Sequence, residues 1–419
     1  MKIILLSTND SRGGAARSAY RIYKGLSNIG VTSMMMVQEK ETSDPLVIGP
    51  AGPYEITKSI ILPLLEYLPM LFFRSTNRAL HSPAIISTLN LGTLNRLRPD
   101  IVQLQWVNRG FVKPETLLKI NKPLVWRFAD YWPFCGAEHI PTEEKRLVEG
   151  YKKSNRPSYE KGLDINRWVF NRKLKVFSKV HDLHIVTPSK WLADMVKKSY
   201  LCSKFPVTVI PNGLDHNVFK PINKKLARSI LNIPTQGRYV IFGALNPFSD
   251  PNKGFPYLHK AIKAYSQLSE SRGTKLLIFG SSKPQKPVEF GFPTYYLDKL
   301  YDDYSLALAY SSADVMIVPS KIESFGQTAL ESMACGTPVL CFDTSGLKDV
   351  VTHKVAGYLA KPYSVSDLTA GLLWMTANGR RLSRLSSSAR QKVLKKFTLE
   401  RQARQYLDLY RKILAKKTK

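Results

Sequence analysis

Short runs of apolar residues alternate along the chain with segments whose apolar residues recur every three or four positions. The strand-like runs are Lys2–Leu6, Ile101–Gln105, Leu124–Arg127, His184–Thr187, Val207–Ile210, Tyr239–Phe242, Lys275–Phe279, Val315–Val318 and Pro338–Cys341. Several of them are apolar over four or five residues, which is typical of strands buried on both faces of a parallel sheet. Helical patterns such as Ala15–Gly30 and Ser324–Cys335 lie between them. This alternation predicts βαβ units, and it occurs twice.

A stretch rich in turn residues divides the two series. Residues Val209–Pro221 carry Pro211, Asn212-Gly213 and Pro221, which is typical of a linker. We therefore expect an α/β protein with two doubly wound, Rossmann-like domains that face each other across a cleft. They would comprise residues 1–216 and 217–396, and in such sheets ligands bind outside the carboxyl ends of the strands. A last helix, residues 397–419 with Thr398 as its N-cap, is expected to pack back on the first domain through an apolar stripe.

One apolar segment, Ile56–Phe73, does not fit this alternation. It contains Lys58 and Glu66 and is broken by two prolines, so it is too interrupted for a spanning helix, which needs about 20 clean apolar residues. Two interpretations stay open: a surface segment that dips into a bilayer, and plain packing in a core or between domains. The first apolar run, Met1–Ser7, is too short for a secretory signal and fits a first strand.

Charge narrows the possible partners. The 419 residues are 44% hydrophobic, which excludes wholesale disorder, and 62 Lys and Arg oppose 32 Asp and Glu for a formal charge of +30. Most of the excess lies in Lys145–Lys204 and Arg380–Lys419. Such a field attracts anions. No nucleic-acid module or aromatic-basic interleaving is present, so we expect no nucleic-acid partner and favour an anionic membrane surface. Four cysteines without a C-x-x-C pair indicate reduced thiols in a cytosolic protein. The histidines lack neighbouring ligands and no D-x-D pair occurs, so we expect no metal.

The densest chemistry lies in "PSKIESFGQTALESMACGTPV", residues 319–339. A buried strand ends there, a short loop carries Glu323, and a helix begins near Phe325-Gly326 with Glu331 on its second turn. A helix N-terminus presents free N–H groups to a diphosphate, and carboxylates accept hydrogen bonds from sugar hydroxyls. By spacing alone, a helix with one capping and one solvated glutamate explains the pattern equally well.

The segment resembles the E-x7-E signature of family 4 glycosyltransferases, which are retaining enzymes of the GT-B fold. Further resemblances follow in the family's order over nearly the whole chain: "TNDSRGGAARSAYRIYKGL", "ADYWPFCGAEH", "IVTPSKWLADMV", "VIPNGLDHNVFKP" and "YVIFGALNPFSDPNKGFPYL". The resemblance implies that Glu323 binds hydroxyls of the donor sugar and Glu331 the ribose. It implies that Lys253 neutralises the diphosphate, which stabilises the leaving group. The sugar and diphosphate would be lined by Phe325, Gly326, Gln327 and Thr328.

The resemblance also assigns residues to the first domain. Gly13-Gly14 would form a phosphate or sugar cradle before the first helix, with Arg17 on its first turn; a tight turn that only packs the helix is the other interpretation. Asp130, in the acceptor-domain loop, would be a third catalytic residue beside Glu323 and Lys253, and Arg17 and His139 would lie on the acceptor side. Two positions depart from the family pattern, since Ala129 stands where a histidine is common and Ala244 where an arginine is common.

The resemblance thus implies a retaining, metal-independent transferase without a cofactor, of the bacterial surface-polysaccharide type. It would move a sugar from a nucleoside-diphosphate sugar to a lipid-linked or growing glycan. We expect it in the cytoplasm, peripheral on the inner face of the cell membrane. Two alternatives stay open. Ala129 and Ala244 favour a non-catalytic membrane-surface protein on a degenerate scaffold, and an epimerase of the GT-B fold that acts on the sugar nucleotide itself is the other.

Overall fold

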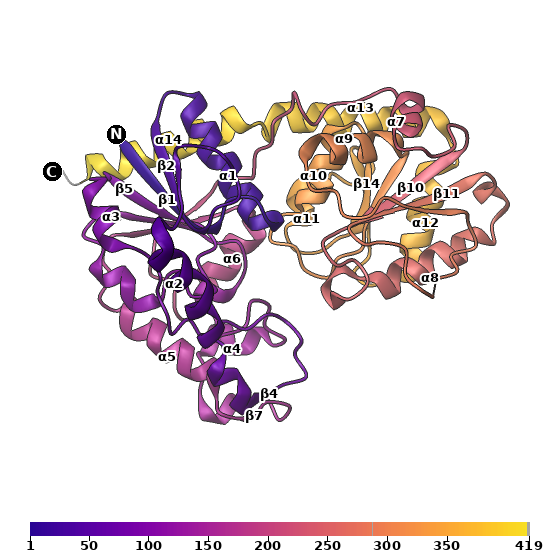
Figure 1. Cartoon of the computed structure of the whole chain (residues 1–419). Coiled ribbons are helices and arrows are strands. Elements are labelled where there is room, and N and C mark those ends of the chain that lie inside the picture. The colour runs from indigo at the N-terminus through magenta and orange to yellow at the C-terminus, as the bar shows by residue number, and fades with distance from the viewer. Residues whose placement is uncertain (287, 417–419) are drawn as a thin grey trace. The chain divides into compact units, whose positions relative to one another are not determined.

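The computed structural model describes residues 1–286 and 288–416, and the chain folds into two compact units. Unit 1 comprises residues 1–211 together with 400–419, and unit 2 comprises residues 212–399. Each unit is built on its own parallel sheet, and Figure 1 traces the elements of both.

Unit 1 contains a seven-stranded sheet in the order β3-β2-β1-β5-β6-β8-β9, with every neighbouring pair parallel. Its strands are β1 (Lys2–Asn9), β2 (Thr32–Glu39), β3 (Val47–Ile48), β5 (Ile101–Leu104), β6 (Leu124–Arg127), β8 (Leu183–Thr187) and β9 (Val207–Val209). Its α-helices are α1 (Gly13–Asn28), α2 (Gly52–Leu65), α3 (Leu91–Arg96), α4 (Glu144–Glu149), α5 (Ile165–Phe177) and α6 (Lys190–Lys198). Short 3-10 helices are η1 (Leu68–Phe72), η2 (Pro114–Lys119), η3 (Trp132–Phe134) and η4 (Lys153–Asn155), and an antiparallel ribbon pairs β4 (Phe73–Arg74) with β7 (Lys161–Gly162).

Unit 2 contains a six-stranded parallel sheet in the order β12-β11-β10-β13-β14-β15. Its strands are β10 (Arg238–Gly243), β11 (Thr274–Phe279), β12 (Thr294–Tyr296), β13 (Val315–Val318), β14 (Val339–Phe342) and β15 (Gly357–Ala360). Its helices are α7 (Lys224–Ile230), η5 (Pro251–Lys253), α8 (Phe255–Ser266), η6 (Ser269–Ser271), α9 (Asp303–Ser312), α10 (Gln327–Ala334), α11 (Leu347–Val350), α12 (Val365–Thr376) and α13 (Gly379–Lys396). The strand order reverses between β10 and β13, which makes the carboxyl ends of these two strands a topological switch point.

The last helix, α14 (Leu399–Ala415), buries its apolar stripe in the core of unit 1. Ala403, Tyr406 and Tyr410 join the core cluster that also contains Ile3 and Val125. The Tyr410 hydroxyl donates to Gln103 on β5, so a polar contact supplements this packing.

All nine strand-like runs of the sequence are strands in the structure. Their buried side chains are almost wholly apolar because each sheet is covered on both faces, as the all-buried patterns of β5 and β13 show. The first helix begins at Gly13 rather than at the predicted Ala15, so the prediction was wrong by two residues. Arg17 consequently lies on the second turn of α1. The start is earlier because Arg12 keeps an extended backbone, with its N–H donated to the Asn9 side chain, and helical structure follows at once.

No helix among the described residues is long and apolar enough to cross a bilayer. The apolar segment at positions 56–73 forms α2, η1 and the first residue of β4.

Candidate functional site

In unit 2, three loops meet at the carboxyl edge of the sheet. They follow the neighbouring strands β10, β13 and β14. Asn252 ties the first loop to the second: its side chain accepts from the Ile322 N–H at 3.0 Å and donates to the Ile322 carbonyl at 2.7 Å. Ser345 ties in the third loop, because its hydroxyl accepts from the Glu323 N–H at 2.9 Å. The loops that carry Lys253 and Glu323 are therefore fixed relative to each other.

Lys253 and Glu323 form an ion pair in this loop cluster. Lys253 Nζ donates to Glu323 Oε1 at 2.8 Å, and the side chains are 23% and 18% exposed. Burial alone would lower the pKa of Lys253, but the charge and hydrogen bond of Glu323 outweigh it and raise that pKa. The pair is thus charged and remains partly open to solvent.

Two glycines let the backbone approach closely beside this pair. Gly254, which ends η5, has φ of 70°, and a Cβ there would lie 1.9 Å from the Pro319 carbonyl oxygen. Gly326 has φ of 100° and is the N-cap of α10, so the free N–H groups of that helix begin directly after the Glu323 loop. These are the backbone features that suit a diphosphate at the switch point.

The other predicted donor-side residues differ in their exposure. Glu331 is 2% exposed, and its Oε2 accepts from the Tyr310 hydroxyl at 3.1 Å. Phe325 is buried in the core. Gln327 and Thr328, on the first turn of α10, are half-buried, and Gln327 accepts from the Asn212 side chain at 3.1 Å. Residues 325, 327 and 328 therefore continue the loop cluster, whereas the Glu331 carboxylate lies below the surface of unit 2.

In unit 1, Asp130 and His139 are in direct contact. His139 Nδ1 lies 2.6 Å from Asp130 Oδ2, and since a carboxylate only accepts, the ring nitrogen donates. His139 Nε2 is then free to accept from the Ser82 hydroxyl at 2.9 Å. Trp106 Nε1 and the Trp132 N–H also donate to the Asp130 carboxylate, at 2.9 and 3.0 Å.

This Ser82–His139–Asp130 chain has the connectivity of a nucleophilic triad, but Ser82 is 0% exposed. A substrate carbonyl cannot reach a sealed hydroxyl. The chain is therefore a structural relay that fixes the orientation of Asp130, whose own side chain is 22% exposed.

Lys173 holds the same loop from below. It lies on α5, is fully buried, and donates to the carbonyls of Trp132 and Gly136, the latter at 2.7 Å. Its ammonium also lies 4.2 Å from the centre of the Trp132 ring. Burial lowers the pKa of Lys173 to about 8, against partial compensation from nearby thiol and carboxyl groups.

Gly13, Gly14 and Arg17 follow β1, next to the switch point of unit 1 between β1 and β5. Gly13 has φ of 81°, and a Cβ at either glycine would meet nothing within 4 Å. The start of α1 is thus open on its outer side. Arg17 is half-buried. The structure brings Asp130 into contact with His139, and Lys253 into contact with Glu323. Gly13 and Gly14 lie at a separate place, the start of α1.

A cavity of about 540 Å³ lies elsewhere in unit 1, at the carboxyl ends of β2 and β3. Gln38, Glu55, Lys58, Ser59, Asn90 and Arg96 contribute to its lining. This cavity was not predicted from the sequence, because the strands β2 and β3 that end there were not predicted.

Four further residues of these sites escaped sequence reasoning: Ser82, Lys173, Asn252 and Ser345. Asn252 had a local signal, since it directly precedes Lys253 in a turn-rich stretch. The others lie far along the chain from the residues they hold. Among the described residues, no group of three His, Cys, Asp or Glu side chains is arranged to hold a metal ion.

Comparison with known proteins agrees with this geometry. Residues 250–392, which include both Lys253 and Glu323, match the family model described as Glycosyl transferases group 1. A D-inositol 3-phosphate glycosyltransferase from Thermobispora bispora is 32% identical over 196 residues, which are 44% of this chain and 45% of that protein. The chain thus matches about half the length of this curated relative.

Two solved structures share the fold over almost the whole chain. Sucrose-phosphate synthase from Thermosynechococcus elongatus superimposes with a TM-score of 0.69 at 20% identity, covering 99% of both chains. Anabaena HepE, in complex with UDP and glucose, does so with a TM-score of 0.64 at 15% identity, covering 98% and 99%. The predicted fold class is confirmed: the chain is α/β with two Rossmann-like parallel-sheet domains of the GT-B type.

Proposed function

We propose that the protein is a retaining, metal-independent glycosyltransferase that uses a nucleoside-diphosphate sugar as donor. The Lys253–Glu323 pair carries the proposal, because it lies at a topological switch point beside the N-terminus of α10, which has no side-chain cap. A diphosphate there would compete for the Lys253 ammonium. Glu323 would then be released to accept hydrogen bonds from sugar hydroxyls. The UDP and glucose bound by HepE, a protein of the same fold, support this donor class.

In the proposed step, the bond between the sugar C1 and the diphosphate oxygen breaks. The acceptor oxygen bonds to C1 on the same face, and its proton passes to the leaving phosphate oxygen. Lys253 stabilises the charge that develops on that phosphate, which is the largest contribution expected of a preorganised cation. No protein base is required, so Ala129 in place of the family's histidine is compatible with turnover.

The acceptor is proposed to be a lipid-linked or growing glycan of a bacterial surface polysaccharide. The 540 Å³ cavity supports a phosphorylated or glycosyl head group, since Lys58 and Arg96 contribute two cations to its lining. The relative's name points to a soluble phosphorylated polyol as the competing acceptor class. The double variant K58M/R96M is expected to raise KM for the true acceptor while leaving donor binding unchanged.

A thermal-shift screen against UDP-, GDP-, ADP- and dTDP-sugars, followed by a transfer assay, tests the donor site. One donor is expected to raise Tm by several degrees, and E323Q and K253M are each expected to lower transfer by about 100-fold or more. E270Q and K260M are matched controls on the exposed surface of unit 2 and should retain full activity. Unchanged transfer in E323Q, or no donor effect with any nucleotide, would refute the proposal.

The same assay separates the two alternative functions, an epimerase and a non-catalytic membrane-surface protein. An epimerase would change the sugar of the donor without any added acceptor, which product analysis detects. A non-catalytic membrane-surface protein would bind anionic vesicles and give neither a donor-induced Tm shift nor donor hydrolysis. We propose a cytoplasmic location, peripheral on the inner face of the membrane.

A further inference from the structure

Helix α2 has its polar and apolar sides reversed relative to an ordinary surface helix. Its polar residues turn toward the protein: Glu55 accepts from the Asn90 side chain at 2.6 Å, and the Ser59 carbonyl accepts from buried Gln38. Glu66, at the end of the helix, is 0% exposed. Burial raises the pKa of Glu66 to about 7. The carboxylates of this segment are therefore turned away from its outer surface, and of its polar residues Thr57 stays exposed.

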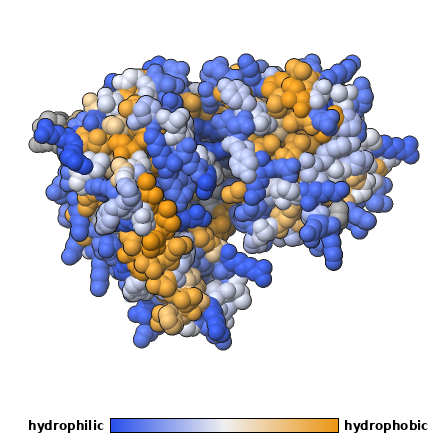
Figure 2. Space-filling model, in the orientation of Figure 1, coloured by the Kyte–Doolittle hydropathy of each residue, from blue (hydrophilic) through white to orange (hydrophobic). Residues whose placement is uncertain are grey.

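The opposite side of the segment is apolar and open. No residue between Gly52 and Leu65 is buried, and Ile60 and Leu64 are 61% and 69% exposed. The exposure continues through η1, where Leu71 is 75% exposed. The exposed set, which we call the α2 face, comprises Ile56, Ile60, Ile61, Leu64, Leu65, Leu68, Leu71 and Phe72. Figure 2 shows this face as a hydrophobic strip over α2 that runs toward the part of unit 1 with β4 and β7.

Cations border the far end of the α2 face. The ribbon places Arg74 directly across from Lys161, and both side chains are exposed. Arg78, also exposed, follows on the same segment. Glu66 is the only acidic residue from position 56 to position 80, and it is buried. The border of the face is thus positive without opposing surface carboxylates on its own segment.

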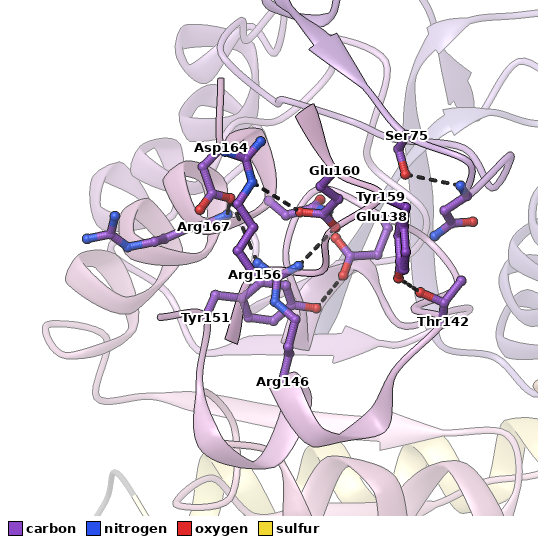
Figure 3. Close-up of polar contacts among 12 residues, drawn as sticks. Ser75, Glu138, Thr142, Arg146, Tyr151, Arg156, Tyr159, Glu160, Asp164 and Arg167 are labelled. Carbon is purple, nitrogen blue, oxygen red and sulfur yellow. Dashed lines mark hydrogen bonds and ion pairs between the residues drawn. The ribbon is translucent and has the colours of Figure 1, made fainter. Parts of the chain in front are cut away.

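A buried ion network holds the ribbon in place (Figure 3). Arg146 and Glu160 pair at 2.9 Å with both side chains below 5% exposed, and Asn166 also donates to Glu160 at 2.8 Å. Arg156 donates to the carbonyl of Gly162 in β7 at 3.0 Å. The cations of the ribbon are therefore presented from a fixed base.

We propose that the α2 face docks on the surface of an anionic lipid bilayer, with its apolar side chains at the boundary between head groups and acyl chains. Arg74, Arg78 and Lys161 would meet the lipid phosphates. Helix α2 holds Pro63 and is too short to span, so it lies along the surface. A second copy of this chain fits less well, because a chain of charge +30 would bring two positive borders together. The inference deepens the membrane part of the proposed function and rests on it, but it needs no catalysis.

Vesicle co-sedimentation with the full chain tests the α2 face. The wild type is expected to bind vesicles of phosphatidylcholine with 30% phosphatidylglycerol, and binding should weaken steeply in phosphatidylcholine alone or at high salt. The double variant I60E/L64E is expected to weaken binding on the order of 100-fold, since it places charges where the apolar contact forms. R74A/K161A should weaken binding to anionic vesicles about 10-fold and leave the residual binding to neutral vesicles unchanged.

A matched control comes from unit 2. Leu226 and Ile230 on α7 have the same i, i+4 spacing and are 54% and 57% exposed, so L226E/I230E makes the same chemical change elsewhere. This control should bind vesicles like the wild type, and all variants should keep wild-type Tm. Equal loss in both double variants, or vesicle binding unaffected by I60E/L64E, would overturn the proposal.

Two further readouts keep the outcomes separate. If sedimentation equilibrium shows a dimer that I60E/L64E converts to a monomer, the face is a contact between copies and the bilayer proposal is wrong. Donor hydrolysis in solution reports on the active site alone: E323Q should lose it and keep vesicle binding, whereas I60E/L64E should keep it. Failure of the transferase proposal is thereby distinguishable from failure of the docking proposal.

Discussion

The polar clusters of the two units differ in how much solvent reaches them. In unit 2, the Lys253–Glu323 pair is about one-fifth exposed and joins two loops whose positions are fixed by hydrogen bonds between the Asn252 side chain and the Ile322 backbone. In unit 1, Ser82, His139 and Lys173 are sealed, and only part of Asp130 reaches the surface. The first cluster has charge available for a ligand. The hydrogen bonds of the second cluster are made within the protein, where they hold a loop in place.

The difference shows that side chains connected like a catalytic site can still be closed to substrate. Ser82, His139 and Asp130 in unit 1 are connected like a catalytic triad, but Ser82, which would be the nucleophile, is buried. The ion pair in unit 2 is simpler and yet can exchange its internal contact for contacts with a donor.

Removing the buried ammonium group of Lys173 in unit 1 should have the largest effect. K173M leaves the carbonyls of Trp132 and Gly136 buried without their donor, so we expect a loss of about 4 kcal/mol in the free energy of unfolding. Urea denaturation measures it. K204M is the control, because Lys204 is exposed and donates to only one carbonyl, and it should cost under about 1 kcal/mol. Equal losses would mean that Lys173 does not hold the loop.

The loop cluster of unit 2 should be most sensitive at Gly254. G254A would place a methyl group against the Pro319 carbonyl and would strain a positive φ. We expect the free energy of unfolding to fall by about 3 kcal/mol and the donor-induced Tm shift to disappear. Gly273 has nearly the same φ, 73°, but open space around its Cα. G273A should therefore cost about 1 kcal/mol and keep donor binding. A G254A variant that binds donor normally would contradict the assignment of this loop.

Much of the fold and part of the candidate site could be predicted from the sequence. Buried parallel strands are apolar without interruption, so β6 and β13 were predicted with their observed bounds. Strand β2, which reads "TSMMMVQE", mixes polar residues with methionine and gave no such signal. Glu323 was found because it lies in a local motif next to a strand end, and Lys253 was found through the resemblance of its loop to the family's diphosphate-contacting loop. Their 2.8 Å contact depends on strand order, which no local pattern encodes.

The sealed network of unit 1 lay beyond sequence reasoning for the same reason. Ser82 and His139 are 57 positions apart, and Lys173 and Trp132 are 41 apart. Single serines and lysines are common, and only the fold reveals that these are buried. The open question over Ile56–Phe73 was whether it packs inside. Most large apolar side chains of α2 and η1 are exposed, whereas Met70 packs against the core of unit 1.

The two lysines should respond to pH with different signs. Lys173 has a folded-state pKa of about 8, below its usual value, so between about pH 8 and 10.5 the unfolded chain binds a proton that the folded chain does not. Its contribution to the free energy of unfolding therefore rises with pH in that window, by up to about 1 kcal/mol per pH unit. The pKa of Lys253 is raised, so its contribution is constant below the unfolded value and is lost only above it.

Urea unfolding of the wild type, K173M and K253M from pH 7.5 to 10 measures both slopes. The difference between wild type and K173M should increase with pH, whereas the difference between wild type and K253M should stay flat over the same range. If the difference between wild type and K173M does not change with pH, the Lys173 ammonium is not desolvated in the folded wild type.

The smallest expected change tests whether the relay in unit 1 is only structural. S82A removes the hydroxyl that donates a hydrogen bond to His139 Nε2. We expect the free energy of unfolding to fall by about 1 kcal/mol with no change in the donor-induced Tm shift. S312A, which removes an equally buried hydroxyl that bonds within its own helix, should cost a few tenths of a kcal/mol. Because Ser82 is 0% exposed, a fluorophosphonate probe should not label the folded protein, and mass spectrometry after digestion would detect any adduct. A fluorophosphonate adduct on Ser82 would show that reagents reach the hydroxyl, and the contrast between an open cluster in unit 2 and a sealed one in unit 1 would then fail.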